Sequence, residues 1–411
     1  MRRLILALAW ALIVAGPVSA ATPVAWVEMT ASGPEARVVT ESAACPEMVV
    51  GERRLPMEVR AGPDPAFANR VCAAPLPSGP ESVTVAGIEL PRPKARPDRL
   101  VIFGDSGCRL TALVTQHCNS PSGWPFAKVA ALAAARRPDL VIHVGDYYYR
   151  EKPCPVGVKG CAGSPYGDQW ATWKAELFDP ARPLFAGAPW VFTRGNHETC
   201  LRGGAGWFRL LDAAPQPKPC AAPADSFAVD IGGTRLLVVD SSDTEDATAP
   251  PALVATFASR LAGLAGLGDP TWIVTHRPFW YAARHGKRLA DGITNATERA
   301  AARSADLTGV GLVLSGHVHD FTSMSFGPAR PPQLIVGTGG DVLETGDLPP
   351  PVTGAPRVDG MTTKVFSMGR FGYFLFDRHG HEWVGGFHDL SDRVIARCRL
   401  SARSLRCVTV K

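Results

Sequence analysis

Short apolar runs, each followed by glycine and polar residues, recur along the chain between residues 98 and 320. A run of this kind, bounded by turn residues, is typical of a strand that is buried on both faces. The runs cover residues 100–103, 140–144, 190–192, 272–274 and 312–314. The pattern therefore predicts at least five buried strands.

Segments able to form helices lie between these strands, at residues 127–136, 170–177, 253–264 and 296–304. The alternation of strand and helix predicts an α/β architecture. Ligands of such folds bind on the loops beyond the carboxyl ends of the strands. We therefore expect the polar residues that follow the five strands to converge in space, although more than 200 residues of sequence separate the first from the last.

The region from residue 21 to residue 97 has a different pattern. Short β-like runs at 24–29, 36–40, 57–60 and 82–85 alternate with proline and glycine, and no helical period is present. This predicts a small all-β module, ending in a stiff proline-rich linker at 91–97. Residues 98–411 would then form the main α/β domain, with a β-rich tail at its C-terminal end.

The first 20 residues carry the features of a secretory signal peptide. Two arginines precede twelve consecutive apolar residues, and small residues end the segment at Ala20. Twelve apolar residues are too few to cross a bilayer, which needs about 20. The sequence thus predicts a cleaved signal at 1–20, export to the periplasm or the medium, and no membrane span in the remaining chain.

Composition agrees with a globular, exported protein. Of the 411 residues, 46% are hydrophobic and 20% are charged, which excludes a disordered chain. The net charge of +5 is small and dispersed, so we expect no nucleic-acid partner. In an oxidising space the ten cysteines are disulfide candidates. Their spacing favours pairing between neighbours: 45 with 72, 108 with 118, 154 with 161, 200 with 220, and 398 with 407.

Potential metal ligands follow the predicted strands in ordered succession. They are Asp105, Asp146, Tyr149, Asn196, His197, His276, His317 and His319. Each alone is weak support, because an aspartate after a strand often caps a turn. Together these oxygen and imidazole donors suit hard or borderline cations such as iron, zinc or manganese. His317 and His319 alternate on extended backbone and can reach two neighbouring ions, which predicts a two-metal site.

Four motifs resemble those of the calcineurin-like metallophosphoesterases, and specifically their purple acid phosphatase branch. The motifs are Asp105-Ser-Gly107, Gly145-Asp-Tyr-Tyr-Tyr149, Gly195-Asn-His-Glu198 and Gly316-His-Val-His319. Glycine at 107, where most of the superfamily has histidine, and tyrosine at 149 mark the purple branch. The resemblance covers about residues 98–388 and implies a four-layer α/β/β/α fold, a β-sandwich flanked by helices, preceded by the all-β module.

The resemblance also implies two ligand sets that share Asp146. One ion would take Asp105, Asp146, Tyr149 and His319, and the other Asp146, Asn196, His276 and His317. A phenolate requires a strongly polarising ion, because the ordinary pKa of tyrosine is near 10. We therefore expect Fe(III) at Tyr149, with zinc, manganese or Fe(II) beside it. Tyr147 and Tyr148 are interpreted as packing residues.

The expected reaction is hydrolysis of small phosphate esters by metal-activated hydroxide. The resemblance makes His197 a catalytic residue that, with Asn196, contacts the substrate. His285 is a second candidate for catalysis and substrate binding, and Arg284 for binding, although an exposed loop role is an equal alternative for His285. Monoesters are favoured over diesters on the subclass resemblance.

Two other functions compete with this interpretation. Residues 101–106 are similar to the nucleophile block of Gly-Asp-Ser esterases, with Ser106 as nucleophile, but the late Asp-x-x-His pair of that family is absent from the sequence. The other is an exported binding protein that retains the fold without activity. Every expected ligand position is filled, which argues against it. His143, inside a strand, is interpreted as a core or supporting residue.

Overall fold

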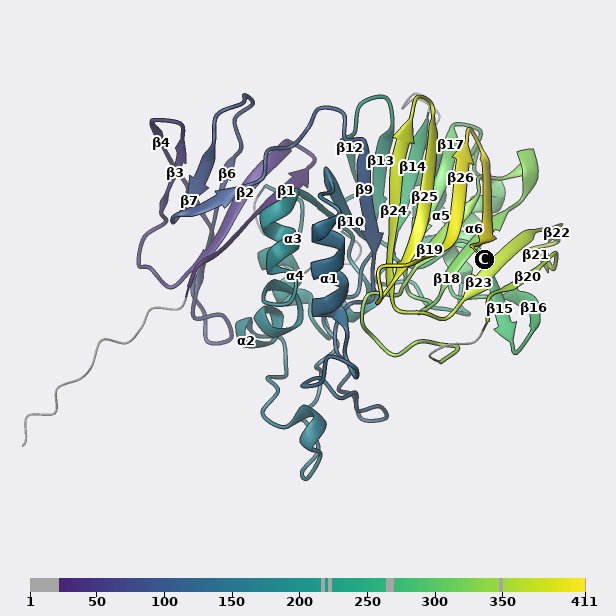
Figure 1. Cartoon of the computed structure of the whole chain (residues 1–411), viewed down its shortest axis with the longest axis horizontal. Coiled ribbons are helices and arrows are strands. Elements are labelled where there is room, and N and C mark those ends of the chain that lie inside the picture. Colours follow the sequence, from purple (N-terminus) through teal and green to yellow (C-terminus); the bar gives the residue numbers. More distant parts are fainter. Residues whose placement is uncertain (1–21, 216–218, 221–223, 264–269, 347–349, 411) are drawn as a thin grey trace, which may run out of the picture.

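The computed structural model describes residues 22–215, 219–220, 224–263, 270–346 and 350–410 (Figure 1). The predicted signal segment, 1–20, lies outside these residues. Six α-helices are described: α1 (Phe126–Ala135), α2 (Trp170–Trp173), α3 (Arg182–Gly187), α4 (Gly204–Leu210), α5 (Pro251–Ala262) and α6 (Ala296–Ser304). None of the described helices is long and apolar enough to cross a membrane.

The larger of two main sheets has eleven strands, in the order β27-β26-β25-β24-β9-β10-β11-β1-β2-β6-β5. Its strands are β1 (Val24–Thr30), β2 (Gly33–Thr40), β5 (Glu58–Ala61), β6 (Arg70–Pro75), β9 (Arg99–Phe103), β10 (Leu140–His143), β11 (Trp190–Phe192), β24 (Gly372–His379), β25 (Glu382–Asp389), β26 (Val394–Ser401) and β27 (Ser404–Thr409). The parallel strands β9, β10 and β11 lie at its centre.

The second main sheet has eight strands, in the order β12-β13-β14-β17-β19-β18-β23-β20. Its strands are β12 (Phe227–Asp230), β13 (Arg235–Val239), β14 (Thr271–Thr275), β17 (Val310–Ser315), β18 (Phe321–Ser325), β19 (Gln333–Val336), β20 (Val352–Gly354) and β23 (Lys364–Met368). Because β13, β14, β17 and β19 are parallel, their carboxyl ends share one edge.

Three smaller sheets complete the described strands. A four-stranded sheet has the order β4-β3-β7-β8, and two hairpins are β15-β16 and β21-β22. Their bounds are β3 (Glu47–Val50), β4 (Arg53–Pro56), β7 (Val83–Val85), β8 (Ile88–Leu90), β15 (Tyr281–His285), β16 (Arg288–Gly292), β21 (Arg357–Val358) and β22 (Met361–Thr362).

The two main sheets pack face to face, with helices on their outer faces (Figure 1). Side chains of β9 alternate between two cores, as the period of a strand requires. Leu100 and Ile102 pack with Trp272 of the second sheet, whereas Val101 and Phe103 pack toward α1 and α3. Helices α5 and α6 cover the outer face of the second sheet. The four-layer α/β/β/α fold is thus confirmed.

The N-terminal region is all β, as expected, but it is not a detached module. Strand β1 pairs in parallel with β11, so β1, β2, β6 and β5 extend the large sheet. Arg37 donates to the carbonyls of Leu210 and Asp212, at 2.9 Å each. Arg60 donates to the carbonyls of Phe208 and Asp212, at 3.1 and 2.8 Å. Both arginines therefore bind the C-terminal end of α4.

All five cysteine pairings predicted from spacing are confirmed. The disulfides are Cys45–Cys72, Cys108–Cys118, Cys154–Cys161, Cys200–Cys220 and Cys398–Cys407. Three of them close loops that follow the predicted ligand motifs, at sequence separations of 10, 7 and 20 residues. These loops are consequently braced next to the candidate site.

Candidate metal centre

The polar residues that follow five strands meet at one edge of the sandwich. Backbone hydrogen bonds join neighbouring loops within each sheet: Asp105 N donates to Gly145 O, and Gly316 N to His276 O, at 2.9 Å each. His276 Nδ1 lies 2.9 Å from the carbonyl oxygen of Val144 and connects the two sheets. The convergence expected from the sequence is therefore present.

Three of the candidate ligands have left-handed backbone. Asp105, Asp146 and His317 have φ of 55°, 59° and 68°, a backbone region that residues other than glycine rarely adopt. Each such residue costs about 1–3 kcal/mol, and residues of this kind cluster at functional sites. The nearby glycines permit close approach: a Cβ on Gly195 would lie 2.0 Å from Asp146 Oδ1.

One group of donors surrounds the Tyr149 hydroxyl. This oxygen lies 3.2 Å from Asp105 Oδ1, 2.9 Å from Asp146 Oδ2 and 3.1 Å from His319 Nε2. His319 Nδ1 lies 2.7 Å from the Val342 carbonyl, which can only accept. His319 therefore carries its proton on Nδ1 when neutral and presents the Nε2 lone pair to the group.

A second group contains Asp146 again. His276 Nε2 lies 3.2 Å from Asp146 Oδ2 and 3.0 Å from Asn196 Oδ1. Ligand atoms of Asp146, His276 and His317 all lie within 4.8 Å of one another. Because His276 Nδ1 donates to a carbonyl, its Nε2 lone pair faces the group. Asp146 Oδ2 is thus shared by both groups.

The spacing of these donors fits metal ions. Two ligand atoms bound at right angles to one ion, at about 2.1 Å each, lie about 3.0 Å apart. The contacts among Asp105, Asp146, Tyr149 and His319 are 2.9 to 3.2 Å. Without cations, burial and the carboxylates of Asp146 and Asp105 raise the pKa of Tyr149 well above its ordinary value. A cation at this point would reverse that effect and favour the phenolate.

His317 is oriented by neighbours that the sequence did not indicate. Its Nε2 lies 3.1 Å from Asp246 Oδ1 and 3.1 Å from an Arg277 nitrogen. This leaves Nδ1 as the atom that could bind a metal. Asp246 lies in an irregular stretch between β13 and α5. No local pattern links it to His317, which is 71 residues away.

The His197 ring packs against the Tyr149 ring at a tilt of 39°, with ring centroids 3.8 Å apart. Its Nδ1 lies 2.8 Å from Glu151 Oε1, and its Nε2 lies 3.9 Å from Asp146 Oδ2. Burial lowers the pKa of His197, although Asp146 and Glu151 oppose that effect. Arg202 donates to Glu151 Oε1 at 2.9 Å. No motif in the sequence indicates that Glu151 and Arg202 lie beside His197.

Two buried glutamates hold the ligand loops together. Glu198 accepts backbone N–H groups of Tyr147 at 2.8 Å and Gly195 at 2.9 Å. Glu176, in a π-helical turn, accepts those of Cys108 and Tyr149 at 2.9 Å each. Burial raises the pKa of both carboxyls to about 8. Glu198 belongs to a recognised motif, whereas nothing in the sequence marked Glu176.

A cavity of about 310 Å³ opens above the two groups of donors. It is lined by Arg109, Asp146, Asn196, His197, Asp246, Tyr281, Thr294, His317, Val318, His319 and Glu344. Arg109 Nε donates to Asp341 Oδ2 at 2.9 Å, and its guanidinium lies 5.0 Å over the Tyr149 ring. The cavity therefore combines a fixed cation with the metal-binding donors.

His285 and Arg284 are not among the residues that line this cavity. They lie at the end of β15, where His285 is exposed. Arg284 donates to the carbonyls of Gly286 and Pro350, at 2.8 and 3.0 Å. The structure thus brings together every predicted metal-site residue and His197, but leaves these two on the hairpin.

Ser106 is placed unfavourably for a serine nucleophile. It is buried, and its hydroxyl lies 2.9 Å from His143 Nε2. Gly145 N donates to His143 Nδ1 at 3.2 Å, so the proton of the neutral ring is on Nε2. His143 therefore donates to Ser106 and cannot accept its proton at that atom. Burial also lowers the pKa of His143, and the arrangement supports a core role.

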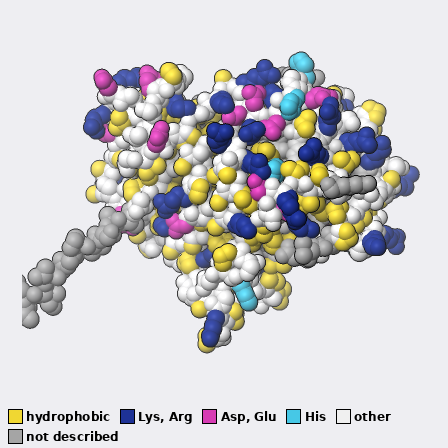
Figure 2. All heavy atoms as spheres, in the orientation of Figure 1, with side chains coloured by type: hydrophobic (Ala, Val, Ile, Leu, Met, Phe, Trp, Pro, Cys, Tyr) yellow, Lys and Arg dark blue, Asp and Glu magenta, His cyan; other side chains and the backbone are white. Residues whose placement is uncertain are grey.

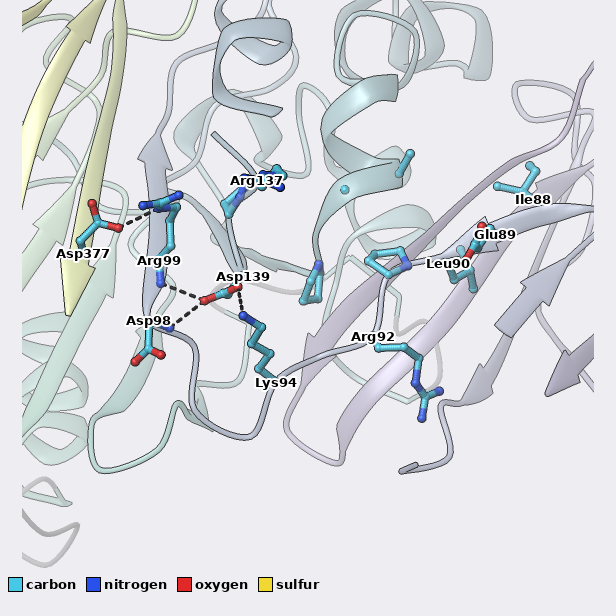
Figure 3. Close-up of a pocket in the computed structure, with 15 residues that line it drawn as sticks. Ile88, Glu89, Leu90, Arg92, Lys94, Asp98, Arg99, Arg137, Asp139 and Asp377 are labelled. Carbon is cyan, nitrogen blue, oxygen red and sulfur yellow. Dashed lines mark hydrogen bonds and ion pairs between the residues drawn. The ribbon is translucent and has the colours of Figure 1, made fainter. Parts of the chain in front are cut away.

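A larger groove, of about 910 Å³, lies between β8, α3 and β9 (Figure 3). Its charged side chains include two neutralised pairs. Lys94 lies 2.6 Å from Asp139, and Arg99 lies 2.7 Å from Asp377. This groove contains no histidine and none of the candidate ligands. The chemistry is therefore placed in the smaller cavity.

Residues 99–321, more than half of the chain, match the model of the calcineurin-like phosphoesterase family. The chain belongs to this family, which makes it a hydrolase of phosphoric esters. The family and the donor set together imply a site for two metal ions.

Solved structures support the same fold. The chain is similar to a purple acid phosphatase from yellow lupin (Lupinus luteus) seeds, with 13% identity, a TM-score of 0.59, and coverage of 94% of this chain and 74% of that one. It is also similar to PhoD, with 13% identity, a TM-score of 0.52, and coverage of 95% and 92%. At such identities the likeness concerns the fold alone. No curated protein sequence matches the chain.

Proposed function

We propose that this protein is an exported phosphomonoesterase of the purple acid phosphatase type, with a two-metal centre bridged by Asp146. The observation that carries the proposal is the position of Asp146 Oδ2. It lies 2.9 Å from the Tyr149 hydroxyl and 3.2 Å from His276 Nε2, between the two groups of donors. A carboxylate so placed can bind both ions of a pair.

The proposed ligands of one ion are Asp105, Asp146, Tyr149 and His319. Those of the other are Asp146, Asn196, His276 and His317. The phenol oxygen of Tyr149 favours Fe(III) in the first position, whereas the imidazole and oxygen donors of the second suit zinc, manganese or Fe(II). Tyrosine at 149 and glycine at 107 support the purple branch, because a Cβ at Gly107 would lie 2.7 Å from the Tyr149 ring.

When bound, the metal pair supplies Lewis acidity and a hydroxide at neutral pH. The protein's own residues position the ester. Asn196 and His197 line the cavity beside Asp146, and Arg109 provides a cation for a phosphate oxygen. Glu151 lies 2.8 Å from Nδ1 of His197, which leaves Nε2 on the side of Asp146. Nε2 can give a proton to the leaving oxygen when the imidazole is doubly protonated, the form that burial opposes and that Asp146 and Glu151 favour. Arg284 and His285 would contact only a substrate that extends beyond the cavity.

Export is supported by the predicted signal at 1–20 and by five disulfides, which are typical of oxidising compartments. The small cavity of about 310 Å³ suits a small phosphate ester. A diester remains the competing substrate class, because the same metal pair would activate either bond.

The test is a panel of phosphomonoesters and phosphodiesters, assayed on protein of known metal content. We expect the wild type to hydrolyse monoesters, and Asp146→Asn to hydrolyse them at least a hundredfold more slowly. Asp139→Asn is a matched control. Asp139 pairs with Lys94 in the larger groove, away from the candidate ligands, so this substitution should leave activity unchanged. Equal activity of wild type and Asp146→Asn would contradict the two-metal proposal. A strong preference for diesters would overturn the substrate class only.

A further inference from the structure

Two loops next to the metal centre form one projection, which we call the stapled projection. It consists of residues 108–123 and 150–167, and each loop is closed by a disulfide, Cys108–Cys118 or Cys154–Cys161. In Figure 1 it extends from the body below α1 and α2. Its base adjoins the centre, because Leu110 N donates to Tyr149 O at 3.0 Å.

The two loops hold each other in place. The backbone N–H of Asn119 donates to Gly160 O at 2.9 Å, and its side chain donates to Ala162 O at 2.8 Å. The His117 ring packs against Gly160, where a Cβ would lie 2.5 Å from the ring. Together with the two disulfides, these contacts fix the shape of the projection.

The surface of the stapled projection is apolar and basic. Leu113 is 95% exposed, Val156 is fully exposed, and Tyr166 is half exposed. Lys152 and Lys159 are exposed as well. The one acidic residue of the projection is Glu151, which is partly buried and accepts from Arg202 at 2.9 Å. Figure 2 shows hydrophobic and basic side chains on the projection in this view, and none of the acidic colour.

We propose that the stapled projection docks on an anionic phospholipid surface. Exposed apolar side chains and lysines on one projection match the interface of a bilayer, where the apolar groups insert and the lysines meet lipid phosphates. A protein partner fits less well. A standard interface buries about 800 Å² on each side, whereas the projection offers three exposed large apolar side chains on two short loops.

This inference does not depend on the proposed catalytic activity, since it rests on loops and surface chemistry alone. Leu201 is a further exposed apolar residue, next to a residue that contacts the base of the projection. It is 98% exposed on the loop closed by Cys200–Cys220, and its neighbour Arg202 donates to Glu151, which directly precedes Lys152. Exposed aliphatic side chains therefore occur on all three braced loops beside the cavity.

The test is flotation with extruded vesicles of phosphatidylcholine, alone or mixed with phosphatidylglycerol. The chain from Ala21 on is used, because it contains every described residue and lacks the apolar segment at 4–15. We expect binding to the mixed vesicles that weakens as salt is raised, and much weaker binding to phosphatidylcholine alone. Lys152→Gln and Lys159→Gln should each reduce the affinity about fivefold. Leu113→Ser and Val156→Ser should each reduce it about tenfold.

Val408→Ser on β27 and Lys364→Gln on β23 are matched controls, since both residues are exposed and lie outside the projection. They should bind vesicles like the wild type. The proposal is wrong if the mixed vesicles do not bind the protein, or if the four projection variants bind as tightly as the controls. Sedimentation of the free protein gives a second criterion. A dimer that Leu113→Ser dissociates would assign the surface to a second copy of the chain and overturn lipid docking.

Discussion

The Tyr149 hydroxyl lies 2.9 Å from Asp146 Oδ2, at the point where two groups of potential ligands share one carboxylate. Burial and the two nearby aspartates raise the pKa of this phenol, so it stays protonated without a cation. Ionisation of Tyr149 is therefore a direct report of metal binding. It also distinguishes a purple centre from a colourless one.

In iron-loaded protein, Tyr149→Phe should abolish the visible absorption of a phenolate bound to Fe(III). The phenyl ring keeps the packing against His197 and removes only the oxygen, so we expect the fold to be retained. Absorption spectra of the iron-loaded variants check this. Tyr148→Phe is the control, because Tyr148 packs on Trp173 and is not a proposed ligand. Absorption that persists in Tyr149→Phe would exclude Tyr149 as the chromophore.

Arg109 should determine affinity for the phosphate group. Its guanidinium is held by Asp341 and is directed at the cavity. A charge-assisted hydrogen bond contributes about 1.5–3 kcal/mol. We therefore expect Arg109→Met to raise KM at least tenfold. Arg109→Lys keeps the charge but lacks the planar guanidinium, and it should raise KM less. Inhibition by inorganic phosphate should weaken in parallel.

The control for Arg109 is Arg137→Met, an exposed arginine that follows α1. It should leave KM and phosphate inhibition unchanged. An Arg109→Met variant with normal KM and reduced thermal stability would show that Arg109 has only a structural role, as the partner of Asp341.

The protonated carboxyl of Glu298 should make the free energy of unfolding decrease as the pH rises. Glu298 is fully buried near the start of α6, where its backbone N–H donates to Asn295 Oδ1 at 3.0 Å. Burial raises its pKa well above the ordinary 4.5, so the folded protein keeps a proton that the unfolded chain loses above pH 4.5. The stabilisation is complete below that pH and decreases above it, by at most about 1.4 kcal/mol for each pH unit.

Glu298→Gln replaces the protonated carboxyl with a neutral group of similar shape. The free energy of unfolding of the wild type, minus that of this variant, should therefore decrease as the pH is raised from 5 to 8, as measured by urea denaturation. Glu89→Gln, at an exposed position in β8, provides the comparison. A pH profile of Glu298→Gln parallel to that of the wild type would contradict a protonated Glu298.

The strands of the centre and their ligands could be predicted because each polar residue directly follows a continuous apolar run. The residues that orient those ligands could not. Glu176 is 27 residues from Tyr149, and Asp341 is 232 residues from Arg109. Such contacts depend on packing of distant segments, for which a single sequence holds no local signal.

The N-terminal strands show the same limit. The apolar pattern of β1 correctly predicts a buried strand, but it does not reveal that β11 is the neighbour. Likewise, Arg37 and Arg60 belong to no sequence motif, yet their guanidinium groups donate hydrogen bonds to carbonyl oxygens at the C-terminal end of α4. The pairing of cysteines was predictable, in contrast, because each disulfide joins nearest neighbours along the chain.

Two disulfides of similar loop length should differ in their effect on the metal centre. Cys108–Cys118 and Cys398–Cys407 span 10 and 9 residues. By chain entropy, each stabilises the fold by about 3 kcal/mol. Only the first braces a ligand loop, because the N–H of Cys108 donates to Glu176, which also accepts from Tyr149.

Replacement of both cysteines by serine in each pair should therefore lower the free energy of unfolding by similar amounts. The 108/118 variant alone should bind zinc or manganese more weakly, by about tenfold, because the loop that follows Asp105 is released. Calorimetric titration of the metal, together with urea denaturation, separates the two effects. If both variants lost metal affinity equally, the loss would follow from global stability, and the brace would have no specific role at the centre.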